Sequence, residues 1–476
     1  MKKRILSVSV IAVAAILMAV IGGLILPSPA SEKAAPQILQ PADNGLAIYE
    51  NAMSTIWAQK GAALAVTKTT QFLIGDELFT ETSRQNVQYL DGNAKIDEVL
   101  TVGEHRVEIS EILVDSTDYI TLNGTQFSGQ VSNDEFQKRL PPAVLVDASL
   151  YETVTAFKSS EMHLIYFSQA TAPETWFNEE IGEFLGARGA VRILSDGHIA
   201  ESAYAITYKT NDIVYHVTFS CKATGETIDI QAPADPENYT PITDPEAPRL
   251  MERACGFLML ADKVSSVYRD RVYCQAFGDE RTQTITVHAG TGESWGTKVT
   301  TNAVITNTGR PGEITNHDHT EVFFNNTYTL YAAGQAPETD DSVDKTAMQK
   351  YCNNLLVSTI LLPQNIVDTV ITETDTTRRI TFLVTSDFAE QIGANACDTL
   401  YAKPQLMDEL AESHSVNKIE CYLELDLHTD IPVASGIIYS GTYRIQGLPY
   451  VLEFRAEQTY HIPSDTALEE IQTAAS

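Results

Sequence analysis

A serine between two glycines is the first group in this sequence that could do covalent chemistry. Gly292-Glu293-Ser294-Trp295-Gly296 matches the G-x-S-x-G pattern of a nucleophile elbow. In that motif a strained turn from a strand into a helix exposes the serine and aims backbone N–H groups at an oxyanion. Residues 284–287 can form the strand, but the β-branched run at 297–301 predicts a second strand instead of a helix. We therefore expect a hairpin loop here, and a serine hydrolase acting through Ser294 is the third of three functional hypotheses.

Two histidines form the next candidate. In His317-Asp318-His319 the imidazoles are two positions apart, so on a strand both would project to one face and could bind one metal ion. Two ligands do not complete a site, and Glu313 or Glu321 would have to contribute a third. Pro311-Gly312 indicates a loop, in which a histidine pair is commonly just solvated. We therefore assign no metal, no cofactor and no catalytic residue, and expect a protein that is not an enzyme.

The six cysteines permit disulfides only if the chain is exported. The sequence has no CxxC motif, and the connectivity cannot be deduced from spacing alone. Free thiols that pack as small apolar side chains are the alternative. The cysteines are Cys221, Cys255, Cys274, Cys352, Cys397 and Cys421.

The net charge of the chain restricts the kinds of molecule that it can bind. The chain has 63 acidic and 32 basic residues and a formal net charge of −31. Nucleic-acid binding needs basic patches that neutralise phosphates, and none is present. We expect no nucleic-acid partner, and a protein partner is unknown.

The N-terminal sequence predicts where in the cell the protein is located. Lys2-Lys3-Arg4 precede an uncharged run from Ile5 to Leu26, which is long enough to cross a hydrocarbon core of roughly 30 Å as a helix. The basic end would stay in the cytoplasm. We expect residues 1–30 to form a transmembrane anchor and residues 31–44 a spacer, which gives a single-pass cell-membrane protein with its bulk outside the cytoplasm. Secretion after cleavage near Ala30 is the alternative.

An aromatic pattern occurs twice in the chain. Tyr208, Tyr215 and Phe219 recur with the same spacing as Tyr443, Tyr450 and Phe454. Apolar and polar residues alternate in both copies, and turn-forming residues (Gln446-Gly447 in the second) separate the two halves of each copy. Each copy therefore predicts a β-hairpin, and the six aromatic residues are candidates to line an apolar cavity.

Other landmarks extend this repeat over the whole chain. Residues 111–124 parallel residues 321–334, and a proline-rich segment at 236–248 separates a first domain, 45–235, from a second, 249–476. Each domain reads as a helix, a run of antiparallel strands, a helical insertion and a strand meander. The pattern predicts helices that start at Pro173, with Phe184 and Leu185 on the buried face, and at Pro404–Ser413. It also predicts a strand at Thr227–Gln231.

We therefore expect a mainly β (α+β) fold. It comprises two tandem repeats of a curved antiparallel sheet, an unclosed half-barrel capped by helices, after an N-terminal transmembrane helix. This order and the Tyr/Phe meander resemble the lipoprotein-carrier fold, the LolA-like and LppX-like family of exported proteins, over most of residues 46–231 and 250–462. The resemblance implies a concave sheet that holds acyl chains or other apolar groups beneath helices, without catalytic residues. This chain differs in being tandem and in lacking a lipobox cysteine.

The first functional hypothesis is a membrane-anchored extracytoplasmic protein that binds a lipid, an acylated protein or another apolar ligand. The second is an envelope or sensory module that uses the same fold to contact a protein. An apolar cavity of about 300 Å³ or more between sheet and helix would favour the first, and a filled core the second.

Overall fold

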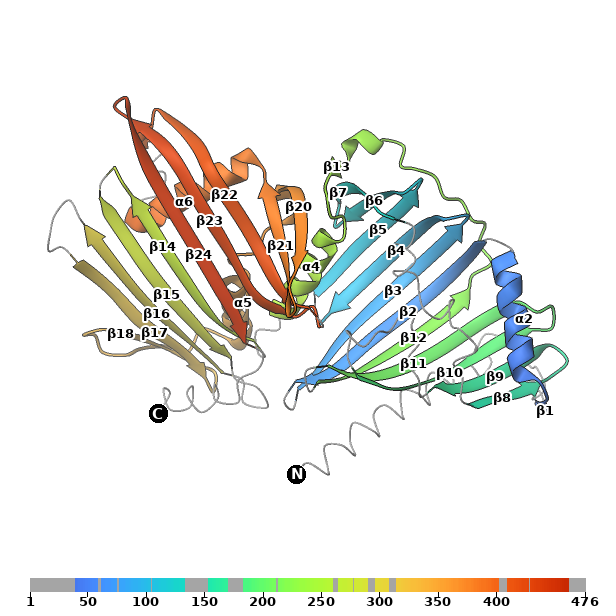
Figure 1. Cartoon of the computed structure of the whole chain (residues 1–476). Coiled ribbons are helices and arrows are strands. Elements are labelled where there is room, and N and C mark those ends of the chain that lie inside the picture. Colours follow the sequence, from blue (N-terminus) through green and yellow to red (C-terminus); the bar gives the residue numbers. More distant parts are fainter. Residues whose placement is uncertain are drawn as a thin grey trace. The chain divides into compact units, whose positions relative to one another are not determined.

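Two compact units make up the structure, which is a computed structural model (Figure 1). It describes residues 39–58, 61–74, 77–103, 105–132, 153–169, 183–210, 213–259, 264–276, 278–289, 296–307, 314–401, 409–427 and 429–461. The first unit ends at Tyr239, and the second contains Thr240 onward together with residues 103–105.

The first unit is built on one antiparallel sheet. Within this unit the order is β1-β8-β9-β10-β11-β12-β2-β3-β4-β5-β6-β7, so the sheet does not close on itself. The strands are β1 (Gln40–Ala42), β2 (Gly61–Ile74), β3 (Glu77–Leu90), β4 (Asn93–Val102), β5 (His105–Val114), β6 (Thr117–Leu122), β7 (Thr125–Gln130), β8 (Thr153–Lys158), β9 (Met162–Gln169), β10 (Glu183–Leu194), β11 (Ile199–Thr210) and β12 (Ile213–Ala223). A 3₁₀ turn, η3 (Pro236–Asn238), lies near the end of this unit, and the short β13 (Thr240–Pro241) begins the second.

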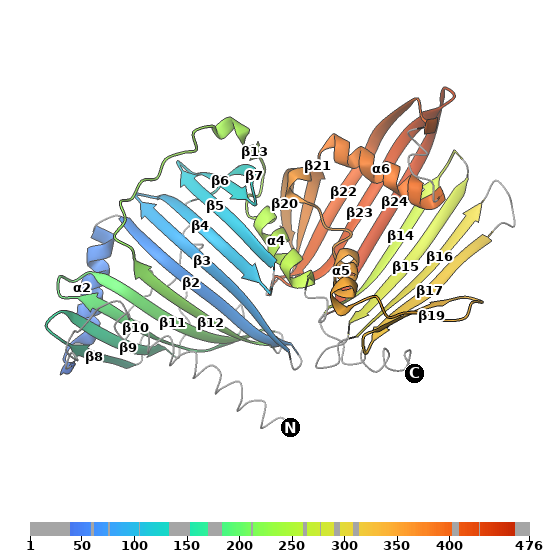
Figure 2. The same ribbon diagram turned by 180° about the vertical axis from the view of Figure 1, so that it is seen from behind.

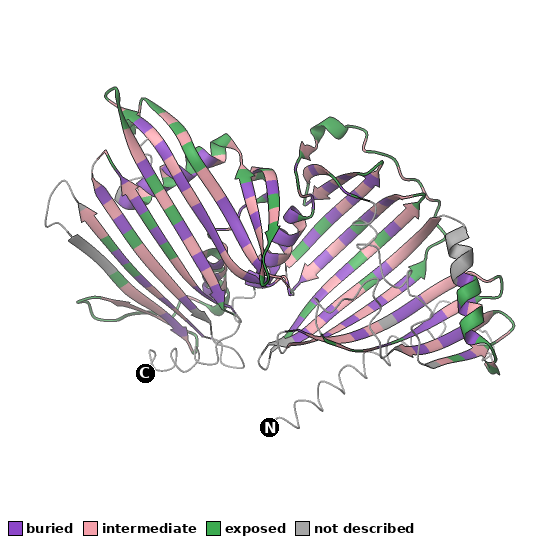
Figure 3. Ribbon diagram, in the orientation of Figure 1, coloured by how far each residue is buried: buried purple, intermediate pink, exposed green. Residues whose placement is uncertain are grey.

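One face of this sheet carries the core of the first unit. Along β12 the buried residues alternate with half-buried ones, as Figure 3 shows for most strands, so a single face is apolar. Helix α2 (Gly45–Ala58) packs on that face through Tyr49 and Ala52. The same core cluster includes Val66 of β2 and Phe219 of β12.

The second unit repeats this plan. Its sheet has the order β19-β18-β17-β16-β15-β14-β24-β23-β22-β21-β20 and is also unclosed. The strands are β14 (Ser265–Cys274), β15 (Asp279–Ala289), β16 (Thr297–Asn307), β17 (Ile314–Phe324), β18 (Thr327–Ala332), β19 (Glu338–Asp340), β20 (Ile366–Glu373), β21 (Thr377–Val384), β22 (Ser413–Asp426), β23 (Pro432–Ile445) and β24 (Leu448–His461). The helices are α4 (Ala247–Leu258), α5 (Lys345–Leu356), α6 (Ser386–Tyr401) and the 3₁₀ turn η4 (Pro363–Asn365). Figure 2 shows α5 and α6 in front of the strands of this sheet.

The strand orders of the two units confirm the tandem organisation. Reading from β8 to β7 in the first sheet and from β20 to β19 in the second, every strand has a counterpart at the same place in the order. The predicted hairpins occupy equivalent places as β11–β12 and β23–β24. Tyr208 pairs with Tyr215 in one, and Tyr443 pairs with Tyr450 in the other. The turn at Gln446-Gly447 has positive φ at both residues (53° and 76°), as a two-residue type I′ turn requires.

Three local predictions need correction or lie outside the described residues. Phe184 and Leu185 are in β10, not in a helix, because the strand begins at Glu183. The helix predicted from Pro173 otherwise falls outside the described residues. Of the helix predicted at 404–413, residues 404–408 are outside the described part, residues 409–410 are helical, and Ser413 already begins β22. Residues 227–231 form no strand, because β12 is already paired on both sides, with β11 and β2.

Two helices of the second unit were not predicted. Asp344 caps α5 by accepting a hydrogen bond from the Ala347 N–H at 2.8 Å. The buried Met348, Cys352 and Leu356 recur every four residues along α5. Helix α6 occupies the insertion between β21 and β22.

The predicted anchor at residues 5–26 lies outside the described residues. Within the described part of the chain, no helix combines the length and the apolar character needed to span a membrane.

Candidate functional site

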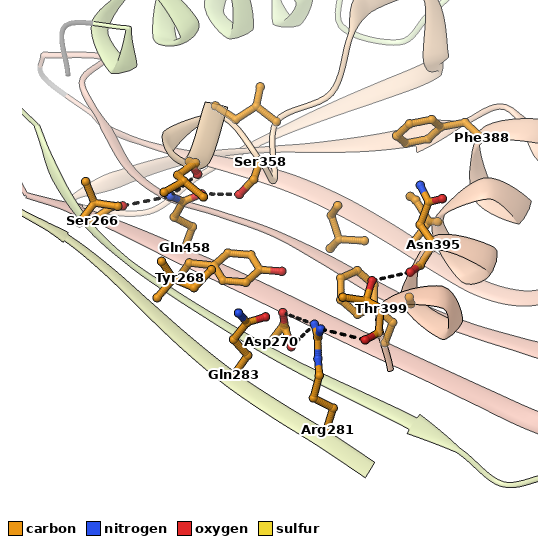
Figure 4. A pocket seen from close by; sticks show the side chains of 18 of the residues that line it. Ser266, Tyr268, Asp270, Arg281, Gln283, Ser358, Phe388, Asn395, Thr399 and Gln458 are labelled. Carbon is orange, nitrogen blue, oxygen red and sulfur yellow. Dashed lines mark hydrogen bonds and ion pairs between the residues drawn. The ribbon is translucent and has the colours of Figure 1, made fainter. Parts of the chain in front are cut away.

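A cavity of about 490 Å³ lies in the second unit, between the sheet and its helical side (Figure 4). Its floor is formed by β14, β15, β23 and β24. One wall is α6, and the other is the segment that joins α5 to β20 through η4. The volume falls within the usual range for small-molecule sites, which is roughly 300–1,000 Å³.

The middle of the cavity is apolar. Ile285 of β15, Ile437 of β23 and Phe454 of β24 rise from the floor, and Phe388 and Ile392 of α6 face them. Side chains alternate across a strand, so the residues of β15 that face the cavity are Arg281, Gln283, Ile285 and Val287. This strand therefore carries a gradient from a charged end to an apolar end.

A buried ion pair lies at the charged end. Nη2 of Arg281 donates to both carboxylate oxygens of Asp270, at 3.0 and 2.8 Å, and Nη1 reaches the carbonyl oxygen of Thr399 in α6 at 3.5 Å. The side chains are only 9% (Arg281) and 1% (Asp270) exposed. Nε of Arg281 has no hydrogen-bond partner among the described residues. The pair thus leaves one unsatisfied N–H donor buried in a low-dielectric setting.

Burial perturbs the acid groups at this end. Desolvation raises the pKa of Asp270, and the opposing attraction and hydrogen bonds from Arg281 only partly offset it. The pKa of the Tyr268 hydroxyl is also raised, first by burial and then by the neighbouring Asp270. Tyr268 hydrogen-bonds Asp270, so its phenol keeps its proton and supports the carboxylate.

A second polar network fixes the wall opposite α6. The amide nitrogen of Gln458 donates to Ser266 Oγ at 3.1 Å and to the Leu355 carbonyl at 3.0 Å. Its oxygen accepts from Ser358 and Thr359, both at 3.3 Å. Gln458 is completely buried, and every hydrogen-bonding group of its amide is used. The segment after α5 is therefore held against β14 and β24 by directed bonds.

Helix α6 rests on an aromatic cluster beside the cavity. The ring of His414 stacks on Tyr443 with centroids 4.1 Å apart, and its Nε2 lies 2.5 Å from the Tyr439 hydroxyl. A Cβ at Gly393 of α6 would overlap that hydroxyl, so only glycine lets the helix approach this closely. Burial lowers the pKa of His414, opposed by the charge of Glu390. The imidazole is therefore neutral at neutral pH.

The six predicted lining residues are divided between two environments. Phe454 borders the cavity, Tyr443 lies beneath α6, and the half-buried Tyr450 pairs with Tyr443. In the first unit Tyr208 and Tyr215 stack on one another with centroids 4.9 Å apart. Phe219 belongs to the core cluster that also holds Tyr49 of α2.

The residues considered for chemistry are dispersed. Ser294 lies outside the described residues, but β16 follows at Thr297, so the predicted strand after the pentapeptide is confirmed. His317 and His319 lie in β17, so the loop predicted for this pair is wrong; the side chain of His317 is not among those described. Glu321 binds the hydroxyls of Tyr328 and Tyr351, at 2.8 and 2.7 Å. Within the described residues, no cluster of three or more His, Cys, Asp or Glu side chains could hold a metal.

Asp270 and Arg281 were not identified from the sequence. Comparison of the two repeats shows that only the second unit has charged residues at these two positions. In the second unit, Phe454 of β24 pairs with Val272 of β14, and Val272 pairs with Arg281 of β15. At the equivalent places in the first unit, Phe219 of β12 pairs with Lys68 of β2, and Lys68 pairs with Ser83 of β3. Serine therefore stands in the first unit where the second has Arg281. By the same register, Val66 stands in the place of Asp270 and belongs to the first unit's core.

Comparisons with known proteins add little. No protein-family model matches the chain. No curated protein matches it either. Among solved structures, the MucA/MucB complex of Pseudomonas aeruginosa is 10% identical, with 88% of this chain and 99% of that chain covered and a TM-score of 0.18. Kievitone hydratase from Nectria haematococca is 8% identical, with 84% and 89% covered and a TM-score of 0.13. The ywiB protein from Bacillus subtilis is 8% identical, with 34% and 93% covered and a TM-score of 0.14. At such TM-scores these similarities carry no argument.

Proposed function

We propose that this protein is a non-catalytic binding protein whose second unit holds a lipid, an acylated protein or another apolar ligand. The observation that carries the proposal is the 490 Å³ cavity between the sheet and α6. A filled core at this place would have favoured a module that only contacts other proteins. The cavity exceeds the roughly 300 Å³ at which a small-molecule site becomes the better interpretation.

The lining supports an amphipathic ligand with an uncharged polar group. Its apolar part would lie against Ile285, Ile437 and Phe454. Its polar group would meet the side-chain amide of Gln283 near the charged end. The Arg281 charge is already balanced by Asp270, so an anionic head group would bring an uncompensated charge into a buried site. An ester, amide or hydroxyl oxygen would instead accept a hydrogen bond at no such cost.

The location proposed for this activity rests on the sequence. The apolar run at residues 5–26 supports a single-pass anchor that leaves both units outside the cytoplasm. An anchored binding protein would meet lipids or acylated proteins as they leave the membrane. The element order that resembles the lipoprotein-carrier family supports the same role.

Native mass spectrometry of the protein purified from its own membrane tests this function. The expected spectrum shows the chain with one noncovalent adduct, which collisional activation releases as a neutral amphipathic lipid or an acylated peptide. The detergent is exchanged beforehand, so that a detergent adduct is recognised by its mass. A spectrum that contains only the bare chain, even after incubation with lipid extract from the same membrane, would contradict the proposal.

A further inference from the structure

Two cysteine side chains meet where α6 packs on the sheet. Cys274 is the last residue of β14, and Cys397 lies in the second half of α6. Their thiols are in hydrogen-bonding contact. Both residues are buried, at 1% and 0% exposure. Their proximity could not be predicted from the sequence, because Cys397 lies in α6, a helix that was not predicted.

Independent contacts place the same part of α6 on the same strands. Thr399, two residues after Cys397, accepts a hydrogen bond from Arg281 of β15. Arg281 pairs with Val272, two residues before Cys274. The thiol contact is therefore part of the docked interface between α6 and the floor of the cavity, not an isolated approach of two side chains.

The other four cysteines have different neighbours. Ser202 lies beside Cys221, Glu252 beside Cys255 and Glu420 beside Cys421. Cys352 of α5 is 3.5 Å from the Thr297 hydroxyl. The contact between Cys274 and Cys397 is thus the thiol pair that the fold brings together among the described residues.

We propose that Cys274 and Cys397 form a disulfide that ties α6 to β14 when the chain folds in an oxidising compartment. A disulfide supplied by an oxidised thiol–disulfide oxidoreductase, or by a small-molecule disulfide, is the oxidant. The thiolate of one cysteine attacks it to form a mixed disulfide and releases one thiol. The second thiolate then displaces the remaining half as a second thiol. Two protein thiols lose two protons and two electrons, and the oxidant's disulfide gains them.

The bond must form before α6 is docked. The hydrogen bond with the Cys274 thiol, and then burial, raise the pKa of Cys397 in the folded protein, so almost none of the reactive thiolate exists there at neutral pH. The folded reduced chain should therefore resist oxidation, and the folded oxidised chain should resist reduction. The bond would close a loop of about 120 residues, which strongly restricts the unfolded chain.

The consequence concerns the wall of the cavity. Helix α6 contributes Phe388, Ile392 and Asn395 to the lining, and the bond would hold its second half on the sheet. Opening of the cavity would then be limited to the segment after α5 or to the first turns of α6. This consequence rests on the proposed binding function, but the disulfide itself does not.

Oxidative refolding of the full-length chain tests the disulfide directly. The protein is unfolded, reduced and refolded in detergent with a mixture of reduced and oxidised glutathione. We expect an intact mass 2 Da lower, four of the six thiols still titratable after denaturation, and one cross-linked peptide that joins Cys274 to Cys397. Reduction of this species should lower its unfolding midpoint by about 5–10 °C.

Two variants sharpen the result. Cys274→Ser should abolish the 2 Da loss, whereas Cys421→Ser, which removes a buried thiol on β22, should retain it. Peptide mapping of the wild-type protein decides the matter even if a variant fails to fold. Six free thiols after oxidative refolding, or a bond between any other pair, would overturn the proposal. Neither outcome bears on whether the cavity binds a lipid.

Discussion

Replacing Arg281 with methionine is expected to lower the free energy of unfolding of the second unit by about 3–5 kcal/mol at neutral pH. The substitution keeps most of the side-chain volume but removes the charge that compensates Asp270. That carboxylate is only 1% exposed, and its remaining contact with Tyr268 cannot replace two charge-assisted hydrogen bonds. Chemical denaturation followed by circular dichroism measures the change.

The defect should depend on pH in a defined direction. The folded-state pKa of Asp270 is raised from its ordinary 3.8, so the folded protein holds this proton more tightly than the unfolded chain does. The resulting stabilisation is complete below pH 3.8 and is lost as pH rises through the folded pKa. Without Arg281 the pKa rises further, because the attraction that opposed desolvation is gone. The deficit relative to wild type should therefore be largest at neutral pH and shrink as the pH falls towards 3.8.

Two further variants test the cause. Asp270→Leu combined with Arg281→Met removes both charges and should recover most of the lost stability. Arg271→Met, on the neighbouring strand, removes a half-exposed ion pair with Glu280 and should cost no more than about 1 kcal/mol. If the Arg281→Met protein were as stable as wild type at neutral pH, or equally destabilised at every pH, then Arg281 would not be stabilising the fold by compensating the buried Asp270 carboxylate.

Ile285→Trp is expected to weaken ligand binding at least tenfold while the protein stays folded. Ile285 is half-buried and lines the cavity, so the larger indole can occupy the empty space instead of displacing packed neighbours. A tenfold loss corresponds to about 1.4 kcal/mol of binding free energy. Titration with a fluorescent fatty-acid ester, whose emission rises in an apolar site, measures the dissociation constant.

A matched control lies next to it on the same strand. Thr284 is also half-buried, but it projects to the opposite face of the sheet, away from the cavity. Thr284→Trp should leave the dissociation constant within about twofold of wild type, because it adds the same ring outside the site. If both variants bound the ester as tightly as wild type, the cavity would not be the binding site. If both lost affinity to the same extent, the substitutions would be disturbing β15 in general.

The parts of the fold that were predictable from sequence are those set by local chemistry. The alternation around Tyr215 and Tyr450, and the Gln446-Gly447 turn, specify two hairpins whose registers the structure reproduces. Helix α6 was missed because several of the residues that it buries, Ala389, Gly393, Ala396 and Cys397, are small and give only a weak apolar signal. Its position depends on small residues that fit against Tyr439, which is a tertiary contact.

The site was not predictable for a related reason. Asp270 and Arg281 are both inward-facing residues of strands, but neither belongs to a motif, and their contact requires the β14–β15 register. The signal that was present is an alternation of polar residues at inward positions, Tyr268 with Asp270 and Arg281 with Gln283. A charged residue at an inward position of a predicted strand is expected to have a partner on a neighbouring strand, because charged side chains are rarely buried unpaired.

Photoaffinity mapping tests most directly the central claim that the cavity of the second unit holds the ligand. The probe is a neutral acyl ester with a diazirine in its chain, and the cross-linked peptides of the full-length protein are sequenced. We predict labels on β15, β24 and α6, at or next to Ile285, Phe454 and Ile392, that excess unlabelled ester removes and that Ile285→Trp lacks. Labels confined to the first unit, or labels that unlabelled ester does not remove, would contradict the claim.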